Sequence, residues 1–364
     1  MQSDFQSGRQ QGRQSGRQQG RQHGSPFDVA ARYGVPELHV CVRPEVGLYA
    51  LIAIHNVRRG PALGGCRYAP YANAEAALDD VTRLARAMSY KAAINEIPYG
   101  GGKSVVLAPL EADQRAAAFE ALADFVDTLG GRYIITEDSG TGEADMDLMA
   151  ARTRHVVGTS QAAGGCGDPS PSTSLGVCCG IEAAVRHRLE RDSLEGVHVA
   201  IQGVGNVGFG LARELKACGA ILTVTDRNMA AAERCAAETG AQVVDEQAIY
   251  DVAADVFAPC ALGGAINPDT IGRLRTSIVA GAANNPLATP EMGSELHRRG
   301  ILYAPDYVIN AGGLTHVALW HLEDLRPRLL AIGDRLSNIF EQAAATGRQP
   351  EQVADSMAES MLTA

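Results

Sequence analysis

Two lysines and an aspartate have the types and spacing that carbonyl and amine chemistry needs. Lys91 and Lys103 lie twelve residues apart, and Asp138 closely follows a short apolar run over 133–136. An amine can act as a base or a nucleophile, and a carboxylate can move protons to and from nitrogen. The alternative is an ordinary surface ion pair between a lysine and the aspartate.

The segment before Lys91 predicts an amphipathic helix over 74–91. Apolar residues recur at helical spacing from Leu78 to Met88, and Asn73 is a suitable N-cap. Lys91 falls on the same apolar stripe, three residues after Met88. Its ammonium group either extends past the apolar face to solvent or works inside a cleft.

Glycines precede Lys103 and also fill an earlier segment. Gly100–Gly102 come directly before Lys103, and an apolar strand is predicted at 105–107. We expect these glycines to let the backbone approach a ligand closely. The Gly/Pro-rich stretch 60–67 is predicted to be a loop.

The remaining pattern predicts an α/β protein with two domains. Strands at 38–42, 47–55 and 133–136 and a helix at 114–129 make up the first region. The Gly/Pro/Ser-rich segment 160–174 bridges to repeated β-α-β units from about 175, which are typical of a doubly wound parallel sheet. After about 315 the chain is predicted to be helical.

A dinucleotide-binding fingerprint lies in the second region. The β-rich run 197–202 leads into Gly203, Gly205 and Gly208, then a helix at 209–218, a strand at 221–225 and Asp226. The glycines allow a tight turn, approach of a pyrophosphate and close helix packing, while the helix N-terminus supplies N–H groups. An acid at the end of the second strand accepts hydrogen bonds from ribose and repels a 2′-phosphate. The fingerprint therefore favours NAD over NADP.

Several longer motifs resemble the Glu/Leu/Phe/Val dehydrogenase family, in order, from about residue 35 to 345. They are Gly60–Arg67, Met88–Lys91, Gly100–Lys103, Thr136–Thr141, Ala258–Gly263, Gly281–Asn285 and Tyr303–Gly313. The resemblance implies an N-terminal domain, 27–165, for substrate binding and oligomerisation, completed by C-terminal helices over about 318–364. It also implies a Rossmann-type NAD-binding domain at 170–317, with the active-site cleft between the two.

The resemblance also implies roles for four polar residues. Lys91 corresponds to the lysine that binds the substrate carboxylate, and Lys103 to the lysine that activates water as a general base. Asp138 corresponds to the carboxylate that shuttles a proton to and from the amine nitrogen. Asn284 corresponds to the amide near both substrate and nicotinamide. Hydride would leave the amino-acid Cα for NAD, and water would convert the iminium to a 2-oxo acid and ammonia.

Further contacts are implied on both sides of the cleft. The substrate is expected to meet Leu63, Gly64, Gly65, Thr136, Leu314 and Val317, besides Lys91 and Asn284. The cofactor is expected to meet Thr173, Gly203, Val204, Gly205, Asn206, Val207, Gly208, Asp226, Arg227, Cys260 and Ala261, besides Asn284.

Leu63 disfavours glutamate as the substrate. Glutamate dehydrogenases of the resembled family usually carry a lysine at this position, and a carboxylate buried without such a partner costs several kcal/mol. Leu63, Leu314 and Val317 suit a branched aliphatic side chain, so leucine, valine and isoleucine are favoured. Thr136, however, stands where branched-chain enzymes of the family tend to have alanine, and the stretch 331–334 resembles phenylalanine dehydrogenases. An aromatic substrate is the alternative. A non-catalytic NAD-binding relative is a second alternative, although the two lysines and Asp138 are all present.

Charge and hydropathy exclude other classes of function. The chain of 364 residues has a net charge of −10, which argues against a general nucleic-acid binder. No apolar run approaches the roughly 20 residues of a membrane helix, and no signal peptide is evident. We expect a cytoplasmic homo-oligomer whose partners are small molecules, with neither nucleic acid nor membrane.

The cysteines and the N-terminal segment are expected to be unrelated to catalysis. The eight cysteines form no Cys-x-x-Cys pair, so we expect reduced, mostly buried thiols and no metal site. Residues 1–26 repeat Gly-Arg-Gln every four residues with little to bury, which predicts a disordered tail. An anionic partner for its arginines is the alternative to a tail without a specific role.

Overall fold

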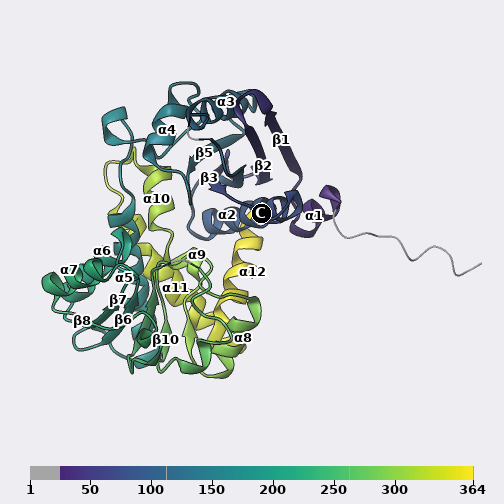
Figure 1. The fold of residues 1–364 in the computed structure, drawn as a ribbon. Helices are drawn as coiled ribbons and strands as arrows, with labels where there is room; N and C mark the ends of the chain where they lie inside the picture. Colours follow the sequence, from purple (N-terminus) through teal and green to yellow (C-terminus); the bar gives the residue numbers. More distant parts are fainter. Residues whose placement is uncertain (1–24, 112, 262, 364) are drawn as a thin grey trace, which may run out of the picture.

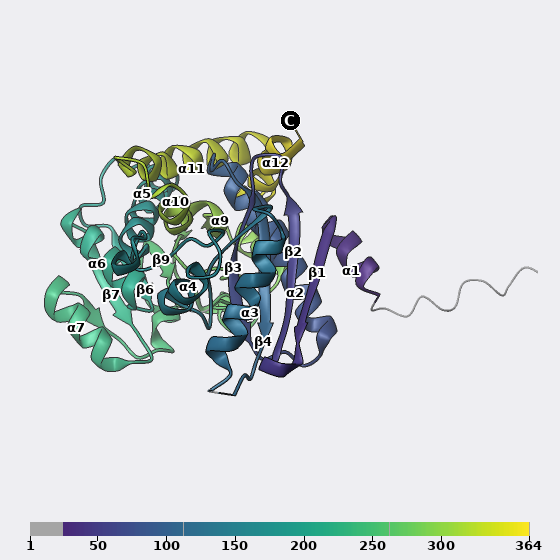
Figure 2. The same cartoon turned by 90° about the horizontal axis from the view of Figure 1, so that it is seen from above.

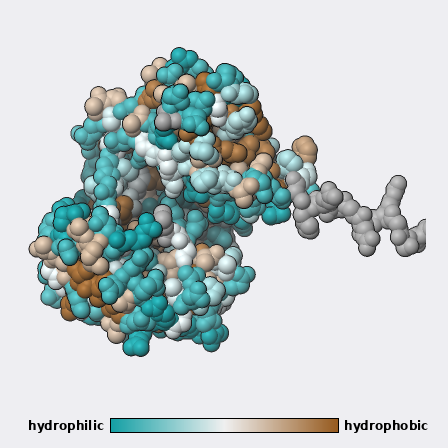
Figure 3. Space-filling view, viewed as in Figure 1, coloured by the Kyte–Doolittle hydropathy of each residue, from teal (hydrophilic) through white to brown (hydrophobic). Residues whose placement is uncertain are grey.

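The chain folds into two α/β lobes with a hollow between them (Figures 1 and 3). The computed structural model describes residues 25–111, 113–261 and 263–363. Residues 1–24 of the predicted tail therefore lie outside the described residues. Ser25 and Pro26, which the same prediction included, instead belong to the start of helix α1, because the Ser25 side chain caps it.

The N-terminal lobe is built on a mixed sheet with the strand order β1-β2-β4-β3-β5. Strand β2 pairs antiparallel with β1 and β4, whereas β3 pairs parallel with β4 and β5. The carboxyl ends of β3, β4 and β5 consequently lie at the same edge. The strands are β1 (Glu37–Arg43), β2 (Leu48–Asn56), β3 (Ala62–Ala69), β4 (Gly100–Leu107) and β5 (Tyr133–Glu137).

Helices cover both faces of this sheet. Helix α2 (Ala74–Ile94) begins at the predicted cap, where the Asn73 side chain accepts a hydrogen bond from the Ala76 N–H. The predicted apolar stripe is buried, and it packs with α1 (Pro26–Tyr33) over β2 and β4. Helices α3 (Arg115–Thr128) and α4 (Glu143–Ala150) bury the opposite face around Phe119 and Tyr133.

The C-terminal lobe contains a fully parallel sheet with the strand order β11-β10-β9-β6-β7-β8. The order reverses at β6, which is the switch point where doubly wound folds bind ligands. The predicted α/β class and the Rossmann-type sheet are confirmed. The strands are β6 (His198–Gln202), β7 (Ile221–Thr225), β8 (Gln242–Val243), β9 (Val256–Pro259), β10 (Ile278–Val279) and β11 (Leu302–Tyr303).

The helices that surround this sheet also join the two lobes (Figure 2). Helix α11 packs along α5, and α12 reaches back to α2, where Arg86 pairs with Glu359. The helices are α5 (Ser170–Leu189), α6 (Asn206–Ala217), α7 (Met229–Thr239), α8 (Pro290–Arg298), α9 (Asp306–Ile309), α10 (Gly312–Leu319), α11 (Arg326–Thr346) and α12 (Pro350–Thr363). Across the described residues, none of these helices has the length and apolar character needed to cross a membrane.

The prediction of a loop at 60–67 was wrong. Most of this stretch is strand β3, and the glycines of Gly100–Gly102 likewise belong to β4 rather than to a turn before it. The reason is close packing, because a Cβ atom at Gly64 would overlap the backbone of Gly102. Glycine here lets adjacent chains approach one another, which a propensity argument interprets as a loop.

Candidate active site

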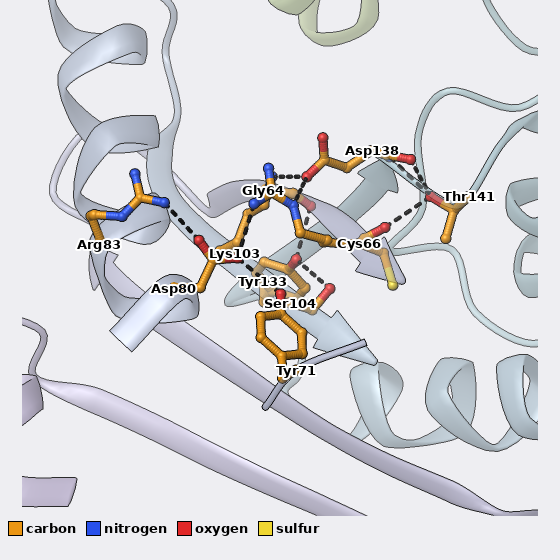
Figure 4. Close-up of polar contacts among 11 residues, drawn as sticks. Gly64, Cys66, Tyr71, Asp80, Arg83, Lys103, Ser104, Tyr133, Asp138 and Thr141 are labelled. Atoms are coloured by element: carbon orange, nitrogen blue, oxygen red, sulfur yellow. Dashed lines mark hydrogen bonds and ion pairs between the residues drawn. The ribbon is translucent and has the colours of Figure 1, made fainter. Parts of the chain in front are cut away.

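Lys103 and Asp138 form a buried ion pair at the carboxyl edge of the N-terminal sheet. The Lys103 Nζ lies 2.5 Å from the Asp138 Oδ2, and the Lys103 side chain is only 7% exposed. Lys103 belongs to β4, and Asp138 directly follows β5. The two side chains point toward one another in Figure 4. The residues first chosen from their chemistry are thus brought into contact by the fold.

Gly65 makes this contact possible. Strand β3 lies between β4 and β5, so the Lys103 side chain has to cross β3 to reach Asp138. A Cβ atom at Gly65 would lie 3.0 Å from the Lys103 Nζ and 2.7 Å from the Asp138 Cβ. Any side chain at this position would therefore displace the pair. Beneath it, the Tyr133 hydroxyl donates a hydrogen bond of 2.8 Å to the Gly64 carbonyl and fixes the strand (Figure 4).

Asp138 is held as a carboxylate. Burial alone would raise its pKa, but Lys103 and Arg67 favour the charged form, and the pKa lies below the usual value. The Arg67 Nε lies 3.4 Å from the Asp138 Oδ2, and its Nη1 lies 2.9 Å from Asp80. The Thr141 hydroxyl accepts a hydrogen bond from the Asp138 N–H and donates one to the Cys66 carbonyl. The aspartate is therefore oriented from both its backbone and its side chain.

Lys91 reaches across the cleft from the last turn of α2. Its Nζ donates a hydrogen bond of 2.7 Å to the Asn310 Oδ1, and the Asn310 amide donates to Asn284 at 2.8 Å. Burial lowers the pKa of Lys91 to about 8, Lys103 adds to the effect, and Asp306 opposes it. Of the two places expected for the Lys91 ammonium group, solvent or a cleft, the structure thus shows a polar cleft.

The cleft between the lobes has a volume of about 370 Å³, within the usual range of about 300–1,000 Å³ for small-molecule sites. Ten of the predicted site residues line it, namely Gly65, Lys91, Lys103, Thr136, Asp138, Thr173, Val207, Asn284, Leu314 and Val317. The Thr136 hydroxyl is buried without a hydrogen-bond partner among the described residues. Such a group is an available donor to a ligand.

Leu63 and Gly64 do not line this cleft. Leu63 is 1% exposed and packs in an apolar cluster with Leu314, Ala318 and Leu319. Leu314 of the same cluster lines the cleft, so Leu63 belongs to the apolar packing around the cleft wall and not to its surface. Gly64 is buried between strands, where its carbonyl accepts the hydrogen bond from Tyr133.

The predicted dinucleotide segment has the geometry that a pyrophosphate needs. Gly203 follows β6 with a φ of +92°, and Gly205 begins α6 without any capping side chain. No heavy atom lies within 4 Å of where a Cβ atom of Gly205 would be, whereas one at Gly208 would overlap the Gly203 carbonyl. The N-terminus of α6 is therefore uncapped by any side chain and has free space at Gly205, which fits an anionic group.

Asp226 shapes this segment from the end of β7. Its Oδ2 accepts a hydrogen bond of 2.8 Å from the Val204 N–H, and its Oδ1 accepts one from the Asn228 N–H. Arg227 is exposed beside it. Cys260 and Ala261 flank the turn, since the Cys260 N–H donates to Gln202 and a Gly203 Cβ would lie 2.9 Å from the Ala261 Cβ. These residues, with Asn206, extend the site beyond the cleft along the carboxyl edge of the sheet.

Arg67, Asp306 and Asn310 belong to the site, although sequence reasoning assigned them no role. Asp306 lines the cleft near Lys91, where burial raises its pKa and the Asn285 N–H donates to it at 2.6 Å. Asp306 and Asn310 stand inside a quoted motif, Tyr303–Gly313, and Arg67 ends another, Gly60–Arg67. Their polar side chains inside apolar and glycine-rich motifs were the sequence feature that could have identified them as site residues.

Known proteins resemble this chain over nearly its whole length. Residues 35–155 match the family described as "Glu/Leu/Phe/Val dehydrogenase, dimerisation domain", and 164–233 and 220–327 match "Glutamate/Leucine/Phenylalanine/Valine dehydrogenase". Leucine dehydrogenase of Thermoactinomyces intermedius is 45% identical over 92% of both chains. Phenylalanine dehydrogenase of Bacillus thermotolerans is 41% identical over 89% of this chain and 87% of that one.

A solved structure agrees with the sequence relatives. The crystal structure of L-tryptophan dehydrogenase from Nostoc punctiforme superposes with a TM-score of 0.80 at 40% identity, covering 93% of this chain and 98% of that one. The two lobes, the parallel sheet and the cleft are therefore those of amino-acid dehydrogenases. The chain belongs to the Glu/Leu/Phe/Val dehydrogenase family and is an amino-acid dehydrogenase.

Proposed function

We propose that the enzyme catalyses the reversible, NAD-dependent oxidative deamination of an apolar L-amino acid, with leucine, valine and isoleucine as the favoured substrates. The products are the 2-oxo acid, ammonia and NADH. The observation that carries the proposal is the single cleft lined by Lys91, Lys103 and Asp138 on one side and by Thr173 and Val207 of the dinucleotide lobe on the other.

Lys91 is proposed to bind the substrate carboxylate. Its ammonium group already has one donor direction committed to Asn310, at 2.7 Å, and Asn310 is itself held by Asn284 and the Ala282 carbonyl. This network fixes the position of the charge before substrate arrives, and such preorganisation reduces the cost of binding. Asn284 is proposed to contact both substrate and cofactor from the same network.

Lys103 and Asp138 are proposed to divide the proton transfers. The bound nicotinamide supplies the acceptor for the hydride that leaves the substrate Cα. Passage of the Lys103 proton to the Asp138 carboxylate leaves a neutral amine and a carboxylic acid. The Lys103 Nζ then takes a proton from the water that attacks the resulting iminium carbon, and the Asp138 carboxyl group delivers its proton to the departing nitrogen. Their separation of 2.5 Å allows a proton to pass directly between them.

The lowered pKa of Lys91 predicts how carboxylate binding depends on pH. A lysine is charged below its pKa, so the anchor is present below about pH 8 and is lost above it. We expect the inhibition constant of 4-methylpentanoate, which lacks an amine of its own, to be flat below pH 7. Above pH 8 it should rise by about tenfold per pH unit, because the free enzyme loses one positive charge.

Competitive inhibition measured between pH 6 and 10 checks this expectation. Lys91→Gln is the control variant, because it keeps a hydrogen-bonding side chain but has no charge to lose. It should bind the inhibitor weakly at every pH and show no break. A wild-type inhibition constant that stays flat up to pH 10 would contradict the assignment of the anchor to Lys91.

NAD is proposed as the cofactor because of Asp226. Its Oδ2 orients the turn after β6 and its Oδ1 accepts from the turn after β7, and a carboxylate has further lone pairs for ribose hydroxyls. Its negative charge would oppose a 2′-phosphate at the same place. Thr173, Val204, Asn206, Arg227, Cys260 and Ala261 are proposed to complete the cofactor contacts along this edge of the sheet.

The apolar part of the cleft supports the choice of substrate. Leu314 and Val317 line the cleft with Met88, and Leu63 belongs to the same buried apolar cluster as Leu314. None of these side chains pairs with a second carboxylate, so glutamate is disfavoured. Apolar pockets separate similar side chains by only about 1–3 kcal/mol. The printed names of the relatives include phenylalanine and tryptophan dehydrogenases, which makes aromatic substrates the second candidate.

A panel of L-amino acids, each assayed with NAD and with NADP by the absorbance of the reduced cofactor, tests the proposal. We expect kcat/KM to be largest for leucine, valine or isoleucine with NAD and to be at least about a hundredfold smaller for glutamate. A preference for phenylalanine or tryptophan would favour the aromatic alternative. Turnover of glutamate alone, or a preference for NADP, would contradict the assignments of Leu63 and Asp226 respectively.

The enzyme is also proposed to be a homo-oligomer that associates through the N-terminal lobe. Strand β1 is the edge of its sheet, and Val40, Val42 and Tyr49 are 61%, 41% and 48% exposed on one face of β1 and β2. Figure 3 shows an apolar patch on this lobe. Exposed apolar edges of this kind pair with other chains unless they are covered. The matched description "dimerisation domain" covers the same residues.

A further inference from the structure

A group of sulfur and oxygen ligands lies between α5 and α6, away from the catalytic cleft. Among the residues that the structure describes, Cys178, Glu182 and Cys218 are the one group of cysteine, histidine and carboxylate side chains whose ligand atoms all lie within 4.8 Å of one another. Cys178 and Cys218 are free thiols, and Glu182 forms no ion pair among the described residues. None of them lines the cleft.

Two packed helices supply the ligands in matching pairs. Cys178 and Glu182 are four residues apart on α5, and Glu214 and Cys218 are four residues apart at the end of α6. Residues at this spacing lie one above the other on a helix face. Cys178 and Glu182 of α5 meet Cys218 across the interface, whereas Glu214 is exposed and its carboxylate lies outside this group.

The distances are close to those of a tetrahedral metal site. The Cys218 Sγ already lies 3.8 Å from the Glu182 Oε1. In a tetrahedral zinc site, with sulfur at about 2.3 Å and a carboxylate oxygen at about 2.1 Å from the metal, a sulfur and an oxygen ligand are about 3.6 Å apart. The three ligand atoms, all within 4.8 Å of one another, are therefore spaced slightly more widely than around a bound ion.

The charge of the group also suits a cation. Glu182 accepts only the weak thiol hydrogen bond from Cys218, and Glu214 has no side-chain hydrogen bond among the described residues. No lysine, arginine or histidine lies within 4.0 Å of either carboxylate in the described ranges. Cys178 is 4% exposed, while Glu182 and Cys218 are half-buried and leave a route for an ion.

We propose that Cys178, Glu182 and Cys218 form a binding site for a thiophilic divalent cation such as Zn²⁺, with Glu214 or water as the fourth ligand. Thiolates select zinc over magnesium and calcium, which prefer oxygen ligands alone. Each thiol releases its proton to the buffer when it binds the metal. The bound ion links the C-terminal end of α6 to α5, at the opposite end of α6 from the dinucleotide turn.

Sequence spacing alone did not reveal this site. Metal motifs are usually recognised by short Cys-x-x-Cys spacings, whereas here the thiols come from positions forty residues apart on two helices. The prediction that the cysteines serve no metal therefore rested on local spacing and not on the packing of α5 against α6.

Titration of reduced, metal-free enzyme with Co²⁺ tests the proposal. Cobalt replaces zinc in such sites and gives thiolate charge-transfer absorption with intense visible bands when it is tetrahedral. We expect saturation at one cobalt per chain, displacement by Zn²⁺, and a rise in the thermal unfolding temperature on metal addition. Absence of the charge-transfer band in the wild-type enzyme would overturn the proposal.

Three variants, one of them a double variant, locate the site. Cys178→Ser with Cys218→Ser should remove the band and the thermal shift, and Glu182→Gln should weaken cobalt binding by about tenfold or more. Cys235→Ser is the matched control, because this buried thiol of α7 lies outside the group. The double variant must retain the turnover and unfolding temperature of the metal-free wild type. A band that persists in the double variant, or that is lost in Cys235→Ser, would place the metal elsewhere.

Discussion

Two glycine-rich segments from opposite lobes each carry a residue that lines the cleft, Lys103 and Val207, and they use glycine for different physical reasons. In β4, a Cβ atom at Gly101 would overlap the Ser89 backbone of α2, and one at Gly100 would overlap the Asn56 carbonyl of β2. After β6, the position of a Gly205 Cβ is open, with no heavy atom within 4 Å. The first segment is filled by the protein itself, while the second leaves room for a ligand.

The difference corrects one expectation and supports another. The glycines before Lys103 were expected to admit a ligand to the backbone, but they bring β4 against α2 and β2. Their effect on chemistry is indirect, since they hold the strand that carries Lys103. The fingerprint at Gly203–Gly208 keeps the open helix N-terminus that was expected of it. Clustered glycine thus indicates a close approach, and only the structure distinguishes a neighbouring strand from a ligand.

The largest effect on activity should come from removing the Lys103 side chain, which the packed glycine segment of β4 positions. We expect Lys103→Ala to lower kcat by about a thousandfold or more, the usual range for loss of a positioned base. Dinucleotide affinity should stay within about twofold, because the open segment on the other lobe is untouched. Stopped-flow turnover and fluorescence titration with NADH measure the two quantities.

The exposed Lys216 on α6 provides the control for Lys103. Lys216→Ala removes a lysine with no place in the cleft and should leave both quantities unchanged. Substantial residual turnover in Lys103→Ala would rule out its role as the base. A large loss of NADH binding would instead mean that the two segments do not act separately.

The next effect tests whether the first segment is packed as described. Gly101→Ala forces a methyl group into the Ser89 backbone, so we expect the free energy of unfolding to fall by about 3 kcal/mol. Urea denaturation followed by circular dichroism measures the loss. Gly272→Ala is the control, because a Cβ atom there meets no atom within 4 Å. Equal stability of the two variants would show that the contact between β4 and α2 can accommodate a methyl group at position 101.

Local pattern was sufficient for helices α2 and α3, for most strands of the N-terminal sheet and for the dinucleotide fold, but not for helix α4 or strand β3. The stripe and cap of α2 lie within one continuous segment, so their periodicity is visible in the sequence. Strand β3 was missed because its glycines are required by close packing against β4, which lies more than thirty residues away in the chain. Non-local packing of this kind leaves no periodic trace.

The site residues could be predicted from the sequence where their residue type is rare in this chain. Only three of the 32 basic residues are lysines, and two of these, Lys91 and Lys103, line the cleft. Arginine stays charged in proteins, whereas lysine can lose its proton. The rare residue is therefore found where deprotonation is useful. The contacts of Arg67 with Asp138 and of Asn310 with Lys91 join different strands and lobes, so no local spacing in the sequence predicts them.

The smallest effect concerns the open segment and completes the comparison. Gly205 has a φ of −67°, which alanine adopts without strain, and its Cβ position is vacant. Gly205→Ala should therefore leave the unfolding temperature unchanged, in contrast to Gly101→Ala. The new methyl group would occupy the space through which a pyrophosphate approaches the helix N-terminus. We expect NADH to bind about tenfold more weakly, which corresponds to about 1.4 kcal/mol.

Fluorescence titration with NADH measures this loss, and kcat at saturating cofactor should fall much less, because Lys103 and Asp138 stay in place. The Gly272→Ala variant again serves as the control, since its alanine is equally unhindered but lies away from the cleft. An unchanged NADH affinity in Gly205→Ala would mean that no ligand comes close to this turn, and the distinction between the two glycine segments would then fail at its open end.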